Sequence, residues 1–241
     1  MKARGLFVTG TDTGVGKTRV AVALIHALRA QGLRVAAMKP VSAGNAPRGD
    51  SDPLRAEARV ESYAPGELNE DVVALLQAVN VAADVCDVNP YAFVPAIAPH
   101  IAAQQAGVRI ELDVIAAAYS RLAAAADVVV VEGAGGWRVP LNECEETADL
   151  AQRLGVPVVL VVGLRLGCLN HAVLTAESII HRHLPWAGWV GNHIDPEMTC
   201  RSENIAALHA RLPGPCLGVQ VFQREPLLQA DGQQWLTLPK E

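Results

Sequence analysis

The chain has 241 residues, of which 51% are hydrophobic and 19% charged, so it can bury a sizeable core, and its length favours one large α/β domain over two small ones. Its formal net charge of −5 argues against nucleic acid or an anionic membrane as the main partner and favours small-molecule chemistry. The five cysteines form no C-x-x-C pair, and the apolar runs are too short for a signal peptide or a membrane span. We therefore expect a cytoplasmic protein without disulfides or a zinc site.

Apolar, strand-like runs alternate with helical patterns along the chain. The expected strands are 5–10, 34–41, 127–134, 157–163, 186–194 and 215–221, and the expected helices are 17–31, 98–106, 111–126, 145–154, 169–183 and 201–212. Because the strands are continuous Val and Leu runs, the pattern predicts a doubly wound, mostly parallel sheet with helices on both faces in a single domain. Residues 43–70, rich in Pro, Gly and charge, are predicted to be a mobile loop or an insertion.

The first predicted strand leads into the glycine-rich stretch GTDTGVGKT, Gly10 to Thr18, which precedes a helical pattern. Glycines let backbone N–H groups surround an anion, and the helix N-terminus adds a favourable dipole. The strict pattern G-x-x-x-x-G-K-[ST] is missed by one place, because Thr11 stands where the first glycine belongs. A plain turn with a helix cap is the structural alternative. The order strand, loop, helix favours nucleotide binding.

Polar residues stand at the ends of three further predicted strands, where doubly wound sheets bind their ligands. Lys39 ends an apolar strand, where it is costly unless it meets an anion, although a lysine that reaches solvent is the alternative. Glu132 follows four valines and, with Thr18, would offer Mg²⁺ oxygen ligands, a capping glutamate being the alternative. Asn192 is suited either to a nucleotide base edge or to a turn.

Seven segments resemble the dethiobiotin synthases, ATP-dependent enzymes that close a ureido ring in biotin biosynthesis. In chain order they are VTGTDTGVGKT, KPVSAG, VNPYAF, PHIAA, VVEGAGGW, LVVGLRLGCLNHAVLT and WAGWVGN. The resemblance runs from about residue 5 to about residue 220, and LGCLNHAVLT is unlike generic nucleotide-binding sequence. It implies a P-loop NTPase-like fold, a homodimer, Mg²⁺ as cofactor, and ATP, CO₂ and 7,8-diaminononanoate as substrates.

The resemblance also implies roles for individual residues. Lys17, Lys39 and Thr13 would be catalytic, and Thr18, Asp71 and Glu132 would bind Mg²⁺. ATP would contact the loop and the ends of later strands through Gly14, Val15, Gly16, Lys17, Thr18, Arg19, Asp71, Glu132, Gly133, Ala134, Gly135, Asn192 and His193. The diamine would contact Ser42, Ala43, Gly167, Cys168, Leu169 and Asn170, the last four from the neighbouring subunit. Cys168 itself we interpret as part of a turn, since the implied chemistry needs no covalent nucleophile.

Three acidic residues, Asp50, Asp52 and Asp71, compete for the remaining metal position. Asp71 stands eighteen residues before Asn89 of VNPY, which resembles the family spacing better than the alternatives do. We therefore choose Asp71, and the segment before it becomes an insertion.

The chain departs from some relatives at three positions: Gly14 replaces a loop glutamate, Ala43 a serine, and Asn204 a tyrosine. Recognition of the substrate carboxylate is therefore expected to rest on GCLN, at a helix N-terminus. The implied reaction passes through a carbamate and a mixed carbamic-phosphoric anhydride.

Two other protein classes share the loop and the sheet. ParA/MinD-like partitioning ATPases carry a lysine five residues before the position of Lys17, where this chain has Asp12. Cobyrinate-type amide synthases normally carry a fused glutaminase, for which 241 residues leave no room.

Overall fold

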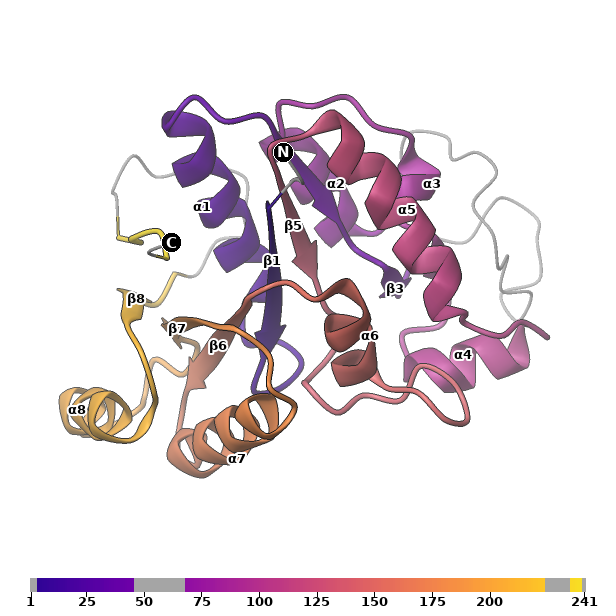
Figure 1. Ribbon diagram of the computed structural model, residues 1–241. Coiled ribbons are helices and arrows are strands. Elements are labelled where there is room, and N and C mark those ends of the chain that lie inside the picture. The colour runs from indigo at the N-terminus through magenta and orange to yellow at the C-terminus, as the bar shows by residue number, and fades with distance from the viewer. Residues whose placement is uncertain (1–3, 46–67, 224–234, 240–241) are drawn as a thin grey trace.

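The computed structural model describes residues 4–45, 68–223 and 235–239. Its main sheet has six strands, all paired in parallel, in the order β2-β5-β1-β6-β7-β8 (Figure 1). They are β1 (Arg4–Gly10), β2 (Val35–Met38), β5 (Val128–Glu132), β6 (Val158–Leu164), β7 (Trp186–His193) and β8 (Cys216–Gln220). The parallel sheet is thereby confirmed, as are five of the six strands expected from the sequence; the sixth, 34–41, is divided.

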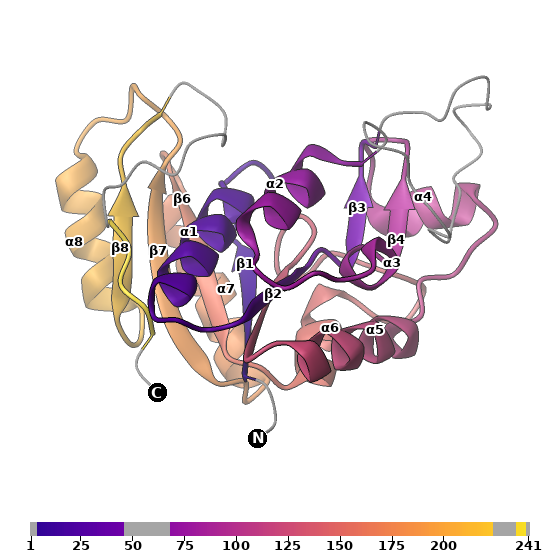
Figure 2. The ribbon, with the colours of Figure 1, turned by 90° about the horizontal axis from the view of Figure 1, so that it is seen from above.

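The helices cover both faces of this sheet, with α1 and α2 on one side and α5, α6 and α7 on the other (Figure 2). They are α1 (Lys17–Ala30), α2 (Glu70–Ala78), α3 (Val85–Val88), α4 (Pro99–Gln105), α5 (Leu112–Ala125), α6 (Thr147–Leu154), α7 (Cys168–His181) and α8 (Arg201–Arg211). Helix α8 packs beside α7. Of the helices within the described ranges, none is at once long enough and apolar enough to span a lipid bilayer.

Strand β5 shows why these runs become central strands. Its residues Val128 to Val131 alternate between two core clusters, with Val129 and Val131 facing the α5 side and Val128 and Val130 facing α1. All four side chains are buried, and burying a valine contributes about 1.5–3 kcal/mol. A run without polar alternation is therefore stable only between two helical layers.

Four short elements were not expected from the sequence. Strands β3 (Val41–Ala43) and β4 (Tyr91–Phe93) form a second, two-stranded parallel sheet, and α2 and α3 lie between these strands in the chain. The predicted strand 34–41 is instead divided at Pro40, which has no N–H to offer a ladder. This division sets Lys39 between two strands.

The segment 43–70, predicted as a mobile loop or insertion, is described only at its two ends. Ala43 closes β3 and Glu70 opens α2. Residues 46–67, which include Asp50 and Asp52, lie outside the described residues.

Candidate active site

The glycine-rich loop joins β1 to α1, as the sequence predicts. Gly14 and Gly16 have φ values of 72° and 86°, a region that side-chain-bearing residues rarely adopt. Gly16 is the N-cap of α1 and supplies no side-chain cap to the N–H groups of the first turn. Lys17 is buried, and its Nζ donates to the Asp12 carbonyl oxygen at 3.0 Å, which folds the lysine back over the loop. These features favour binding of an anion at the helix N-terminus.

Asn192, near the end of β7, contacts the backbone of this loop through its side chain. Its Nδ2 donates to the Val15 carbonyl oxygen at 2.8 Å, and a Cβ at Gly16 would lie 2.1 Å from the same nitrogen. From its position in the sequence, Asn192 suits a base edge or a turn, and the contact with the loop backbone is visible only in the structure. Gly16 is therefore required both for its backbone conformation and for the space that Asn192 fills.

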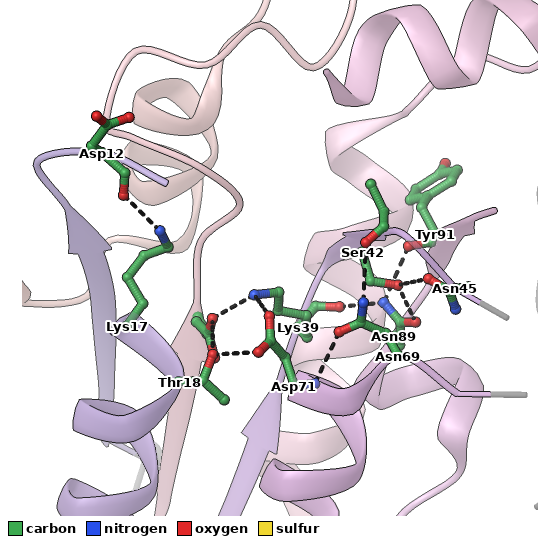
Figure 3. Close-up of polar contacts among 12 residues, drawn as sticks. Asp12, Lys17, Thr18, Lys39, Ser42, Asn45, Asn69, Asp71, Asn89 and Tyr91 are labelled. Carbon is green, nitrogen blue, oxygen red and sulfur yellow. Dashed lines mark hydrogen bonds and ion pairs between the residues drawn. The ribbon is translucent and has the colours of Figure 1, made fainter. Parts of the chain in front are cut away.

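Four polar side chains meet beside the loop (Figure 3). Thr18 lies in the first turn of α1, Lys39 follows β2, and Asp71 lies in the first turn of α2. Glu132 ends β5. Thr18 Oγ1 lies 2.7 Å from Asp71 Oδ1 and 2.9 Å from Glu132 Oε1. Lys39 Nζ lies 2.9 Å from Asp71 Oδ2 and also bonds Glu132 Oε1. Neighbouring parallel strands bring their carboxyl ends together, which explains how distant segments form one cluster.

Hydrogen bonds of the Asn69 side chain hold the N-terminus of α2 in the position from which Asp71 contacts this cluster. Asn69 is its N-cap: Asn69 Oδ1 accepts from the Asp71 N–H at 3.0 Å, and Asn69 Nδ2 donates to the Ala43 carbonyl at 3.0 Å. The cap satisfies a free N–H of the first turn and joins it to β3. The structure thus places Asp71 beside Thr18 and Glu132, the two other residues expected to bind metal.

Lys39 and Glu132 are buried in this cluster, Asp71 is partly exposed, and the cluster holds two carboxyl groups for one ammonium group. The side chains of Lys39 and Glu132 are 6% and 1% exposed, which excludes a Lys39 that reaches solvent. Burial acts to lower the pKa of Lys39, but the Glu132 and Asp71 carboxylates outweigh it and raise that pKa, so Lys39 is charged. Burial raises the pKa of Glu132 despite its lysine partner. One lysine thus faces two carboxylates.

An oxygen-rich cation site fits this cluster. Thr18, Asp71 and Glu132 supply hydroxyl and carboxylate oxygens, the donors that Mg²⁺ prefers, with phosphate and water oxygens usually completing its shell. Glu132 Oε2 is buried and has no hydrogen-bond partner within the described chain. No group of three or more His, Cys, Asp or Glu side chains able to hold a metal occurs among residues 4–45, 68–223 and 235–239. The donor set therefore suits a cation that shares its shell with a nucleotide.

Ser42 belongs to a buried network behind Lys39. Its hydroxyl lies 2.9 Å from both Asn45 Oδ1 and Asn89 Oδ1, while Asn89 Nδ2 donates to the carbonyls of Lys39 and Tyr91 at 2.6 and 3.1 Å. The network fixes the backbone of Lys39 (Figure 3). This role of Asn89 was not predicted from the sequence. An asparagine inside the apolar run VNPYAF nevertheless indicates a buried side chain that needs hydrogen-bond partners.

The glycines after β5 lie against the phosphate loop. A Cβ at Gly135, whose φ is 63°, would be 3.5 Å from Thr13 Oγ1, and one at Gly136 would be 3.7 Å from the Gly10 carbonyl. Thr13 is exposed, and its N–H donates to Asp12 Oδ1 at 2.7 Å. The structure therefore brings the predicted residue Gly135 to the same loop as Thr13, whereas a Cβ at Gly133 would meet Phe7 and Thr147.

Two further predicted nucleotide contacts lie at the edges of this region. His193 is buried beside Asn192, its Nδ1 lies 2.9 Å from an Arg201 nitrogen, and its ring meets Phe222 edge-on at 5.9 Å. Because a guanidinium only donates, His193 Nδ1 is the acceptor. Arg19, on α1, bonds the Gln223 side chain.

The GCLN segment begins α7. Gly167, with φ 93°, is its N-cap without a side-chain cap, and Asn170 is exposed in the first turn. Cys168 is the first residue of the helix and is buried, so its interpretation as part of a turn was wrong. Just before the helix, Arg165 bonds Asp12 Oδ2 at 2.6 Å, which links this turn to the phosphate loop.

The parallel sheet, the loop after its first strand and the Lys17–Thr18 pair at the helix start define a P-loop NTPase fold. The structure resembles MinD of Pyrococcus horikoshii, solved with Mg-ADP, with a TM-score of 0.52 and 16% identity over 90% of this chain and 80% of that chain. It also resembles the MinC:MinD complex of Aquifex aeolicus, with a TM-score of 0.50 and 13% identity over the same shares. At such identities these likenesses show the fold alone.

Sequence comparison gives the family. The AAA_26 family model, described as an AAA domain, matches residues 4–224. The ATP-dependent dethiobiotin synthetase BioD of Nitrosospira multiformis is 50% identical over 92% of this chain and 89% of its own length. The BioD of Pseudomonas aeruginosa strain UCBPP-PA14 is 50% identical over 88% of this chain and 87% of its own length. The chain therefore belongs to the ATP-dependent dethiobiotin synthetases, a family of ligases, as the resemblance in the sequence predicted.

Alanine at two loop glycines is expected to have unequal effects. Gly14 and Gly16 both have positive φ, so each substitution costs about 1–2 kcal/mol of backbone strain. A Cβ at Gly14 would meet nothing within 4 Å, whereas one at Gly16 would collide with Asn192. We expect Gly16→Ala to lose at least about tenfold in ATP affinity, a change of about 1.4 kcal/mol, while Gly14→Ala loses less. Calorimetric titration with ATP and thermal unfolding of both variants measure the difference; equal effects would contradict the role of Asn192.

Proposed function

We propose that this protein is a cytoplasmic homodimer that uses ATP and Mg²⁺ to convert 7,8-diaminononanoate and CO₂ into dethiobiotin. The observation that carries the proposal is the buried cluster of Thr18, Lys39, Asp71 and Glu132 beside the phosphate loop, in a chain half identical to curated dethiobiotin synthetases. A fold alone would not justify this choice, because P-loop sheets serve many reactions.

In this reaction the protein has to bind two anions, the carbamate and ATP, next to each other, and it does not have to supply a nucleophile. CO₂ adds to one amine of the substrate and gives a carbamate. A carbamate oxygen attacks the γ-phosphorus of ATP, and ADP leaves. The second amine nitrogen then attacks the carbamoyl carbon, the bond from that carbon to the phosphate oxygen breaks, and the ureido ring closes as phosphate departs with its electron pair.

Each step gathers negative charge at one place, and the described residues supply the opposing charge. Lys17 lies in the loop that would hold the phosphates, and Lys39 lies at the neighbouring strand end. Bound Mg²⁺ would be held by Thr18, Asp71 and Glu132 and would offset charge on the phosphate oxygens. Ammonium groups fixed in a water-poor site stabilise a developing charge more than mobile ones in water do.

An exposed apolar surface supports the homodimer. Of the six large hydrophobic side chains exposed on the described residues, Leu166, Leu174 and Ile180 belong to α7 or the turn before it, and Leu166 is 93% exposed. Large apolar side chains are enriched where a protein contacts another chain, and these three occur along one stretch of sequence. Residues 167–170, the proposed carboxylate site, lie in the same stretch.

One assay tests the proposed reaction. Purified protein with ATP, bicarbonate and Mg²⁺ is expected to release phosphate only when 7,8-diaminononanoate is added, with one dethiobiotin, identified by mass spectrometry, for each phosphate. If phosphate were released at the same rate with and without the diamine, the protein would behave as a partitioning-type ATPase, and the proposal would be contradicted.

The affinity for ATP is expected to fall above pH 8. Burial and the neighbouring Lys39 lower the pKa of Lys17 to about 8. A lysine is charged below its pKa, so its attraction for the phosphates is present below pH 8 and lost above it, by up to about tenfold per pH unit. Calorimetry between pH 7 and 9.5 measures the trend. Lys17→Arg, which keeps its charge throughout, is the control with a flat profile, and a flat profile for the unmodified protein would contradict the assignment.

A further inference from the structure

We propose that Lys39 exchanges partners during the reaction: it neutralises Asp71 and Glu132 until a divalent cation binds these carboxylates, and the cation then displaces its ammonium toward the transferred phosphoryl group. This inference rests on the magnesium site of the proposed function and adds a step to it. Binding of the metal thereby moves the positive charge of Lys39 from the two carboxylates to the transferred phosphoryl group.

The geometry makes the two cations competitors. Lys39 Nζ and Thr18 Oγ1 bond the same atom, Glu132 Oε1, and they divide the two oxygens of Asp71 between them. Mg²⁺ binds oxygen at about 2.0–2.1 Å. A cation held by Thr18 and both carboxylates would therefore lie within about 5 Å of an ammonium that shares Glu132 Oε1, and like charges at that range repel strongly where water is scarce.

A count of charges gives the direction of the exchange. When both are ionised, Asp71 and Glu132 together carry two negative charges, and Lys39, which bonds both, carries one positive charge. A divalent cation balances both carboxylates by itself, so an ammonium that stayed would be an uncompensated charge at a position only 6% exposed. The anions nearest to it would then be those of the nucleotide and the carbamate.

The backbone of Lys39 is fixed, so the exchange needs only its side chain. Its N–H donates to the Val88 carbonyl at 2.7 Å, and its carbonyl accepts from Asn89 Nδ2 at 2.6 Å. Lysine rotamers interconvert rapidly when their partners are removed. The backbone at the end of β2 thus stays in place while the Lys39 side chain changes between two anionic partners, the carboxylates and the phosphoryl group.

Direct metal binding without nucleotide tests the exchange. Lys39→Met removes the competing charge and keeps much of the length, so we expect it to bind Mn²⁺, followed by electron paramagnetic resonance, at least about tenfold more tightly than the unmodified protein. Lys17→Met is the matched control, because Lys17 Nζ bonds the Asp12 carbonyl and neither carboxylate; it should tighten binding much less. Asp71→Asn in the Lys39→Met background should abolish the gain, which locates the ion.

A second measurement covers the case in which Lys39→Met fails to fold, since it removes the charged partner of the buried Glu132 carboxylate. In the unmodified protein labelled with ¹⁵N at the lysine Nζ atoms, saturating Mg²⁺ should shift the Lys39 signal, assigned with Lys39→Arg, far more than that of Lys17. An unshifted Lys39 signal, or equal Mn²⁺ affinity in unmodified protein and Lys39→Met, overturns the exchange alone. Absence of metal binding in every variant, with ATP present as well, overturns both the exchange and the magnesium site.

Discussion

Lys17→Gln is expected to lower the rate of diamine-dependent phosphate release by about a thousandfold. Removing one fixed charge or donor from a site where charge develops typically costs two to three orders of magnitude in rate, and Lys17 is the lysine of the phosphate loop. The fold should survive, because the Asp12 carbonyl is the only hydrogen-bond partner of Lys17 Nζ among the described residues. In addition, the lowered pKa of Lys17 means that its surroundings disfavour its charged form. Steady-state phosphate release and thermal unfolding measure the two effects.

A second charge removal serves as its control. Arg211→Gln, at the exposed end of α8, also deletes one positive charge, and within the described part of the chain Arg211 bonds only the Ala207 carbonyl of its own helix, so this variant should keep the unmodified rate. A Lys17→Gln enzyme that retained more than about a tenth of the rate, a barrier change below about 1.4 kcal/mol, would contradict the assignment of the phosphate loop.

The features that could be predicted from the sequence are those that depend on residues adjacent in the chain. The valines of β5 have no polar alternation, so only a strand covered on both faces satisfies them, and this predicts the parallel sheet. In such a sheet the residue after each strand faces the binding edge, so the positions of Lys39 and Glu132 followed from the strand ends. The loop from Gly10 to Thr18 was recognisable for the same reason.

Features that depend on pairing between distant segments could not be predicted in this way. Strands β3 and β4 have three residues each, too few to show a period, and each exists because the other pairs with it. The bond between Asn192 and Val15 and the shared Glu132 oxygen join residues far apart in the chain. For Asp71 the sequence offered only a spacing; its capping by Asn69, which brings it to Thr18, became visible in the structure.

Mixing two inactive variants is expected to restore about a quarter of the activity if each active site is built from both subunits. Lys39→Ala damages the proposed phosphoryl-transfer site. Asn170→Asp places a negative charge where the substrate carboxylate would bind, at the N-terminus of α7. Asn170 is exposed, and an acidic residue in the first turn of a helix is favourable, so this variant should fold.

The quarter follows from random association into two-fold symmetric pairs. Equal amounts of the two variants give half mixed dimers, and in a shared-site dimer each of these has one site with both lesions and one with neither. If the site lay within one chain, every site would carry a lesion and activity would stay absent. Lys39→Ala mixed with Lys17→Gln is the control, since both lesions lie in the phosphoryl-transfer half contributed by one chain, and no arrangement of these subunits leaves an intact site. Recovery in the first mixture and none in the control would therefore locate carboxylate recognition on the neighbouring subunit, whereas no recovery despite measured subunit exchange would move it into the chain that holds the phosphate loop.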